Sequence, residues 1–207
     1  MKLINRTFAR NAVASAMLLA AALSSAQAAN FDFSGQAVYN TDVVRISFSL
    51  AADSADFKAW TDSWQAGLNF DPVLQLWAKA GNDYSLITEV DDNDQLGAGQ
   101  GSFDAGIQLS NLSAGQYLLT LSAADNYANG GTLSAGFMLD GSAPVALADW
   151  TQSSSNPNFP DQKGGLWSVK LTSVDQAAVV PEPASWALMG LGLLGLASLS
   201  QRRQRKA

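Results

Sequence analysis

An acidic run in the middle of the chain is the densest group of residues that could do chemistry. Five carboxylates fall within the sixteen residues from Glu89 to Asp104, and they repel one another unless protons or a cation neutralise them. Ca²⁺ takes oxygen ligands from loops, so the run predicts a calcium site with these ligands: Asp91, Asp92, Asp94 and Asp104. It is not an EF-hand, because Leu96 and Phe103 would stand at ligand positions. The alternative is a solvated acidic loop.

The residues that are absent exclude other chemistry. The chain of 207 residues holds no cysteine and no histidine, which rules out a Ser-His-Asp triad, a Cys-His pair, disulfides and the usual zinc sites within this sequence. Its carboxylates could pair as in a small glycoside hydrolase, which is the weaker alternative function. Such an enzyme needs a deep cleft, and a β-domain of about 150 residues is small to form one. We therefore expect that the protein is not an enzyme.

Tryptophan side chains suggest carbohydrate binding as a further alternative. Five of them lie between the two ends of the chain: Trp60, Trp64, Trp77, Trp150 and Trp167. Most tryptophans of a small β-domain belong to its core or its rim. Trp77 stands on the polar phase of its expected strand, so it is the residue predicted to stack on a sugar ring, as in a carbohydrate-binding module.

Hydrophobic alternation with a period of two predicts the elements that position these residues. Ile46 and Phe48 alternate with serines, and Val169 and Leu171 alternate with polar residues near the other end. The expected strands are 44–50, 72–79, 84–89, 103–109, 116–123 and 166–173. They predict an all-β fold, a jelly-roll-like antiparallel β-sandwich, with a long surface loop over 142–162.

The stretch 29–180 is strongly acidic. It holds 5 Lys and Arg against 17 Asp and Glu, a net charge of −12, and the other basic residues lie at the two ends. A charge of this sign repels the phosphate backbone, so we expect no nucleic-acid partner.

Residues 1–28 are expected to be a secretory signal peptide. They combine a basic start, an uncharged apolar segment over 12–23, and the small-residue pattern Ala26-Gln27-Ala28 that signal peptidase accepts. An uncleaved anchor helix is the alternative, but the apolar segment is short for it. The exported chain would begin at Ala29 and form an ectodomain over 29–175.

Residues 184–200 are expected to form a single transmembrane helix. They carry no charge, and as a helix they would span roughly 25 Å, close to the lower limit for a bilayer core. The tail 201–207 would stay in the cytoplasm as a stop-transfer signal through Arg202, Arg203, Arg205 and Lys206. The ectodomain would then lie outside the inner membrane.

A short motif stands before this helix. Within a linker expected over 176–183, Pro181, Glu182 and Pro183 should lie extended at the membrane surface. The motif, the glycine-rich helix and the basic tail together resemble the PEP-CTERM sorting tail of Gram-negative bacteria over 180–207. The resemblance implies that an exosortase, an integral-membrane transpeptidase-like enzyme, reads the motif and removes the helix, and that this chain is its substrate.

The same resemblance implies a transient membrane anchor and a final place at the cell surface or outside the cell. It also implies a link to exopolysaccharide and biofilm. A matrix polysaccharide is the partner on which the tryptophans could stack. This tail is also described for ice-binding proteins, but the chain has no regular Thr-x-Thr ladder to support that activity.

The ectodomain carries a second resemblance, over about 40–140. The segments that carry it, in order, are 69–77, 81–82, 91–92, 103–107 and 114–119. They resemble bacterial pre-peptidase C-terminal domains. The resemblance implies a jelly-roll-like sandwich that serves as an accessory module, with no catalytic residues to carry over. We expect no cofactor apart from the calcium ion predicted at the acidic run.

Overall fold

The computed structural model describes residues 29–150 and 164–181, and these residues form nine strands and two short 3₁₀ turns. The strands are β1 (Ala29–Gln36), β2 (Val43–Leu50), β3 (Phe57–Thr61), β4 (Pro72–Ala80), β5 (Asp83–Val90), β6 (Gly106–Leu109), β7 (Gly115–Ala123), β8 (Leu166–Val174) and β9 (Gln176–Val179). The 3₁₀ turns are η1 (Gln65–Gly67) and η2 (Leu133–Ala135).

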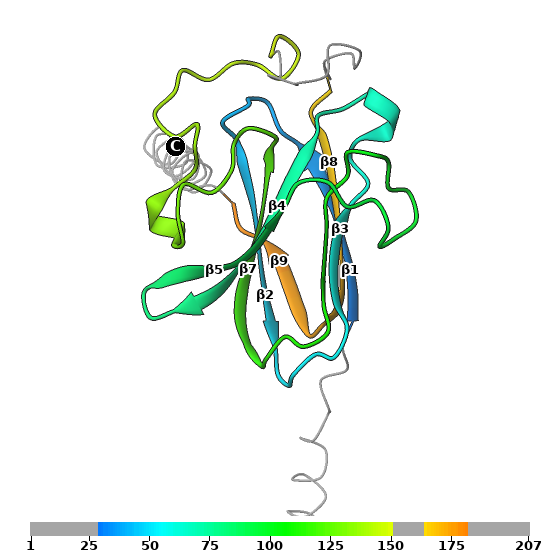
Figure 1. Ribbon diagram of the computed structural model, residues 1–207, viewed down its shortest axis with the longest axis vertical. Coiled ribbons are helices and arrows are strands. Elements are labelled where there is room, and N and C mark those ends of the chain that lie inside the picture. The colour runs from blue at the N-terminus through cyan, green and yellow to red at the C-terminus, as the bar shows by residue number, and fades with distance from the viewer. Residues whose placement is uncertain (1–28, 151–163, 182–207) are drawn as a thin grey trace, which may run out of the picture.

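The strands form two sheets in which every pair of neighbours is antiparallel. One sheet has the order β1-β8-β3-β6, and the other has the order β5-β4-β7-β2-β9. Figure 1 shows the two sheets, with the chain crossing from β8 to β9 at the orange end of the colour scale. The expected all-β fold with antiparallel sheets is therefore confirmed.

The main core lies between the two sheets, where the inward residues of alternating strands meet. Phe48 of β2 stacks on Phe57 of β3 and on Tyr117 of β7, each with ring centroids 5.2 Å apart. Because Phe48 and Phe57 belong to different sheets, this stack joins the two layers of the sandwich. Ile46, Leu76 and Leu171 fill the space around it and are almost fully buried.

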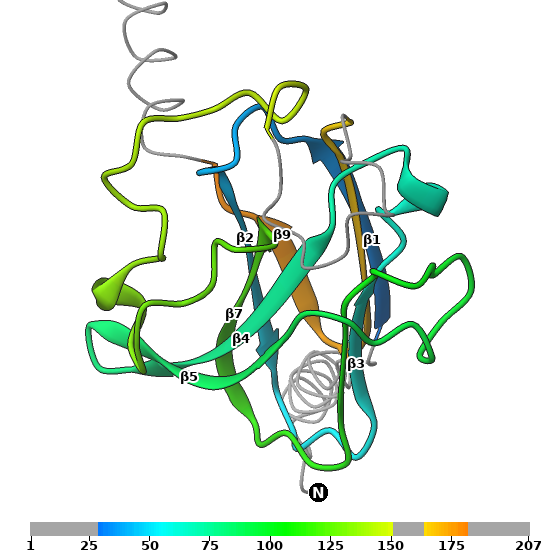
Figure 2. The same ribbon diagram turned by 45° about the horizontal axis from the view of Figure 1, so that its top comes forward.

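A second, smaller core covers the outer face of the five-stranded sheet. Segment 124–140 crosses that face, and its Phe137 packs edge-on against Trp77 of β4. Val43 and Leu118 complete this cluster. In both ribbon views segment 124–150 and loop 91–105 lie on opposite sides of the molecule, the loop beside β3 (Figures 1 and 2).

Three strands were not expected from the sequence. β1 alternates in burial only between half-buried and exposed, and β3 has just five residues, so both give a weak periodic signal. β9 occupies residues that we expected to form the linker 176–183, and it pairs with β2 from Ser49 to Ile46. The linker prediction is therefore wrong for 176–179, which belong to the folded domain.

Two other boundaries differ from expectation. The strand expected over 103–109 begins at Gly106, because the residues before it form a turn in which the Asp104 N–H donates to the Gly101 carbonyl at 2.9 Å. The part of loop 142–162 that the structure describes is tied to the domain: the Leu147 N–H donates to the Val38 carbonyl at 2.9 Å, and Leu147 is buried.

Candidate functional site

The first candidate site is a cluster of three carboxylates at one end of the β4–β5 hairpin. Leu74 of β4 pairs with Val90 of β5, so the residues just beyond this pair come together. Carboxylate oxygens of Asp71, Asp91 and Asp92 lie within 4.8 Å of one another. Asp71 was not among the expected ligands, and it comes from the opposite side of the hairpin.

Repulsion and burial act on the protonation of this cluster. Burial raises the pKa of Asp92 to about 6, and the charges of Asp91 and Asp94 add to the shift. Burial also raises the pKa of Asp91, against the hydrogen bond of 2.7 Å that it accepts from the Tyr127 hydroxyl. One oxygen of Asp91, Oδ1, is buried and has no hydrogen-bond partner within the described residues. The cluster therefore carries charge that protons or a cation would relieve.

Asp104 takes no part in this cluster. It is fully buried, and its Oδ1 accepts hydrogen bonds from the Thr61 hydroxyl at 2.6 Å, the Ser63 N–H at 2.7 Å and the Trp64 N–H at 3.2 Å. Its Oδ2 accepts a bond of 2.8 Å from the Gly101 N–H. With its oxygens used in this way, Asp104 holds the 91–105 loop on β3, and its prediction as a calcium ligand is corrected.

Asp94 is exposed at the start of the same loop, where its carboxylate accepts a hydrogen bond from the Gln95 side chain. The loop is rich in glycine because it packs closely on aromatic rings. A Cβ atom at Gly97 would clash with the Trp60 ring, and one at Gly101 would clash with Trp64. The glycines therefore let the loop pack closely on Trp60 of β3 and on Trp64, which follows that strand.

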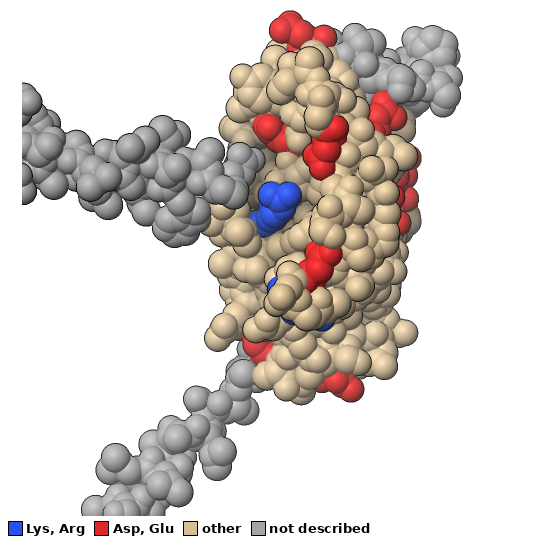
Figure 3. All heavy atoms as spheres, turned by 90° about the vertical axis from the view of Figure 1, so that its left-hand side faces the viewer, with Lys and Arg blue, Asp and Glu red and all other residues tan. Residues whose placement is uncertain are grey.

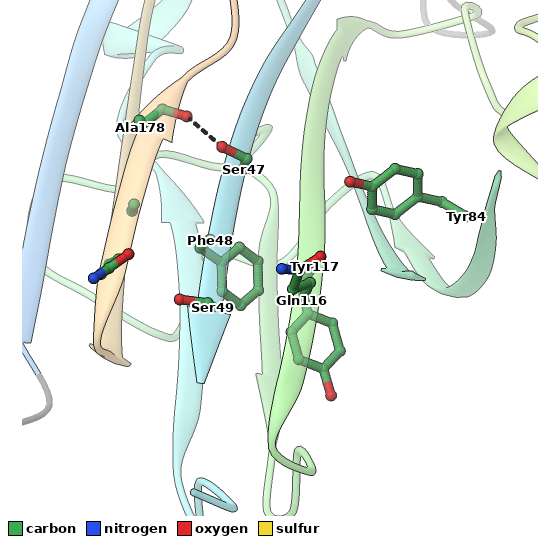
Figure 4. Close-up of a pocket in the computed structure, with 9 residues that line it drawn as sticks. Ser47, Phe48, Ser49, Tyr84, Gln116, Tyr117 and Ala178 are labelled. Atoms are coloured by element: carbon green, nitrogen blue, oxygen red, sulfur yellow. Dashed lines mark hydrogen bonds between the residues drawn. The ribbon is translucent and has the colours of Figure 1, made fainter. Parts of the chain in front are cut away.

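The second candidate site is an open groove of about 410 Å³ on the five-stranded sheet. Residues of β2, β5, β7 and β9 line it, with hydroxyl and amide side chains and the ring of Tyr84 on the outer face: Ser47, Phe48, Ser49, Tyr84, Gln116, Tyr117, Gln176, Ala177 and Ala178 (Figure 4). None of these described residues carries a charge. Figure 3 shows a face that is largely uncharged, with a basic patch near its middle and acidic side chains both around that patch and at the edges.

Trp77 lies away from solvent and cannot serve as a sugar platform in this structure. Its side chain is fully buried under segment 124–140, and its Nε1–H donates a hydrogen bond of 2.8 Å to Thr120 Oγ1. The prediction of a carbohydrate contact at Trp77 is therefore corrected. Tyr84 is the aromatic side chain of the outer face that does reach the groove, with Lys79 Nζ 4.5 Å from its ring centroid.

The third candidate site is the junction between the domain and the sorting motif. β9 ends at Val179, the Val180 N–H donates to the Arg45 carbonyl at 2.8 Å, and Pro181 follows as an exposed residue. The rest of the expected motif and of the stop-transfer tail lies outside the described residues: Glu182, Pro183, Arg202, Arg203, Arg205 and Lys206. So do the expected signal peptide and transmembrane helix. Among the residues that the structure describes, no helix is long and apolar enough to cross a membrane.

Comparison with known proteins matches this junction to a sorting signal. Residues 179–203 match the family model of the PEP-CTERM protein-sorting motif. The motif implies an exported protein that is sorted toward the cell surface through a membrane anchor and processed by an exosortase.

No curated protein matches the chain. Among solved structures, the chain is similar to the Yersinia pseudotuberculosis-derived mitogen, with 11% identity and a TM-score of 0.38, over 75% of this chain and 95% of that one.

Proposed function

We propose that this protein is a non-enzymatic component of the cell surface or extracellular matrix, delivered by its sorting tail and active in exopolysaccharide and biofilm assembly. A signal peptidase removes residues 1–28, the C-terminal helix holds the chain briefly in the inner membrane, and an exosortase then releases the ectodomain. The observation that carries the proposal is the sorting motif at 179–203, which begins at the last residue of the last strand of a folded β-sandwich.

The ectodomain suits an accessory module, as the pre-peptidase resemblance suggested. Buried Asp104 is used to hold a loop, and Asp175 and Asp53 accept hydrogen bonds from the Ala51 and Ala114 N–H groups. The groove on the five-stranded sheet has no carboxylate among its described lining residues, whereas glycoside hydrolysis needs a pair. These features support binding rather than catalysis.

Deleting the gene in the native host and scoring biofilm mass and polysaccharide retention tests this role. We expect both to fall, and to be restored by the full chain but not by a chain that lacks Pro181–Pro183. Unchanged biofilm and polysaccharide in the deletion strain would contradict the matrix role.

A neutral glycan is the ligand that the groove favours. Its hydroxyl and amide groups can both donate and accept hydrogen bonds, as sugar hydroxyls require, and Tyr84 offers a ring at one side. The lining residues carry no charge that would select an ionic ligand. We therefore propose that the groove on the outer face of β2, β7 and β9 binds carbohydrate.

Glycan-array binding by the exported protein tests this second function. Tyr84→Ala should abolish or weaken binding at least about tenfold, since stacking and desolvation at a central aromatic dominate small interfaces. Tyr39→Ala is the matched control, because Tyr39 is an exposed tyrosine that does not line the groove. Equal binding by the two variants would exclude the groove as the glycan site.

A further inference from the structure

The strand that leads the chain out of the domain is also the start of the sorting motif. The family match begins at Val179, which is the last residue of β9 and the partner of Ile46 on β2. The Val180 N–H still donates to the Arg45 carbonyl at 2.8 Å. Pro181 has no N–H and ends the ladder. Within the part of the chain that the structure describes, the last backbone hydrogen bond to the folded domain therefore lies one residue before Pro181.

This arrangement leaves little chain between the domain and the membrane. Three residues separate Val180 from the apolar segment that begins at Ala184, and the four steps from Val180 to Ala184 span at most about 13 Å of extended chain. The interfacial layer of a bilayer is itself about 5–7 Å thick. Enzymes and domains that recognise extended peptides form hydrogen bonds along several successive residues. While β9 stays paired, a membrane-embedded enzyme has little room to enclose the residues on the domain side of the motif.

β9 is suited to detachment. Within the described part of the chain it is an edge strand with β2 as its one strand partner, and three of its four residues are exposed. Ala177 is the residue that reaches the main core. Besides the ladder, the Ser47 hydroxyl donates a bond of 3.3 Å to the Ala178 carbonyl (Figure 4). A short edge strand with so few buried contacts opens at a small fraction of the free energy of global unfolding.

The upstream end of β9 is held more firmly. Asp175 Oδ2 accepts a hydrogen bond of 2.6 Å from the Ala51 N–H, and the Asp175 N–H donates to the Ser49 carbonyl at 3.1 Å. Val174, one residue earlier, is fully buried. Peeling from the C-terminal end can therefore stop at Asp175 and leave β8 and the core intact. Release of 176–180 adds about 17 Å of reach.

We propose that the folded domain and the sorting enzyme compete for β9. The enzyme binds the motif when β9 has peeled from β2 as far as Asp175, and the strand pairs again once the membrane tail has been removed. This inference rests on the proposed processing by an exosortase. The strength of the β9–β2 pairing then sets the rate at which the anchored protein is released.

An engineered disulfide tests the competition, and the absence of native cysteine makes the design clean. Ser47 and Ala178 are directly opposed on β2 and β9, at the Cα separation of about 5.5 Å or less that antiparallel partners have and a disulfide can span. Ser47→Cys/Ala178→Cys therefore locks β9. Ser49→Cys/Gln116→Cys is the matched control, because it links β2 to β7 on the same face and leaves β9 free.

Both full-length variants are followed by pulse–chase in a host that carries an exosortase, where the periplasm oxidises the cysteine pairs. We expect the locked chain to be shortened at least about tenfold more slowly than wild type, and reductant to restore its rate. The control should be shortened within about twofold of wild type. About eight Gly and Ser residues inserted between Val180 and Pro181 should restore the locked chain without reductant, because they supply the missing reach.

Shortening of the locked chain at the rate of the control, with its disulfide intact, would overturn the competition and leave the proposed function standing. Failure of the insertion to restore the locked chain would also overturn it, since reach would then not be the limiting factor. Wild-type chain that is shortened equally in a host without the exosortase would instead overturn the proposed function, and this inference with it.

Discussion

The Trp77 Nε1–H donates a hydrogen bond of 2.8 Å to Thr120 Oγ1, and that hydroxyl donates in turn to Gln75 Oε1 at 2.6 Å. All three side chains are fully buried. They join β4 to β7 beneath segment 124–140, on the face of the sheet that is opposite the main core. The five-stranded sheet is therefore covered on both faces in this region. The polar side chains that segment 124–140 covers form hydrogen bonds with one another.

Thr120→Val should destabilise the protein because it removes the shared hydroxyl and keeps the shape of the side chain. The Trp77 side-chain N–H and the Gln75 side-chain oxygen would each lose a hydrogen-bond partner while they stay buried. The expected loss is about 2 kcal/mol in the free energy of unfolding. The melting temperature of the purified protein, followed by circular dichroism, should fall by about 4–8 °C. Thr120→Ser keeps the hydroxyl and should cost clearly less. Equal losses in the two variants would show that the hydroxyl is not what matters.

The burial of Trp77 could not be predicted from the local sequence. Alternation correctly predicted a strand over 72–79, and Trp77 does stand on the phase opposite to Leu74 and Leu76. An outward residue is exposed only if nothing covers it, and that depends on where segment 124–140 packs. That segment lacks a periodic signal because its contacts with the sheet come from single residues such as Phe137.

The acidic cluster was partly predictable. The sequence placed Asp91 and Asp92 correctly at the end of a strand that follows the turn at Gly81-Asn82. Extending the β4–β5 register beyond Leu74 and Val90 would have brought Asp71 beside them, so the pattern did contain this signal. Asp104 was misassigned because sequence proximity says nothing about its four hydrogen bonds, three of which come from residues 61–64.

Asp104→Asn should destabilise the protein strongly. The asparagine amide nitrogen is itself a donor, and it would face N–H or O–H groups that now donate to the carboxylate. The expected loss is about 2–4 kcal/mol in the free energy of unfolding, the same with EDTA and with calcium. Asp94→Asn is the matched control, because Asp94 is exposed, and it should change stability by less than about 0.5 kcal/mol. Urea denaturation measures both. A loss for Asp104→Asn that appears only when calcium is present would restore Asp104 as a ligand.

Asp92 should make the free energy of unfolding fall as the pH rises toward about 6. Its pKa is about 6 in the folded state and about 3.9 in an unfolded chain, so between these values the folded state binds more protons. This contribution is complete below about pH 4 and is lost above about pH 6. Asp92→Asn should raise the melting temperature at pH 7.5 by about 2–4 °C, or about 1 kcal/mol after allowance for its solvent exposure, and by little at pH 4.5.

Melts of wild type and Asp92→Asn across this pH range check that expectation. Taking the difference between the two curves removes the contributions of the other carboxylates. A difference that does not change with pH would mean that Asp92 keeps an ordinary affinity for its proton.

Calcium remains a prediction from the sequence, and the structure places its first test on Asp71, Asp91 and Asp92. A calcium ion that binds only the folded state adds about 2.7 kcal/mol to the free energy of unfolding when free calcium is at a hundredfold excess over Kd. This should raise the melting temperature by about 5–10 °C. Mg²⁺ at the same ionic strength should do less, because it requires a small octahedral set of ligands. Asp71→Asn/Asp92→Asn should lose the calcium-specific shift. Equal shifts with the two ions would mean that screening of the acidic surface is the whole effect.

The mass of the protein that the native host releases tests the sorting account most directly. Intact-mass measurement should show a chain that starts near Ala29 and lacks residues 184–207, and deletion of the exosortase gene should leave the full C-terminal tail on protein that stays in the inner membrane. Full-length chain in the inner membrane of the exosortase-bearing host, or the same released mass with and without that enzyme, would contradict the account.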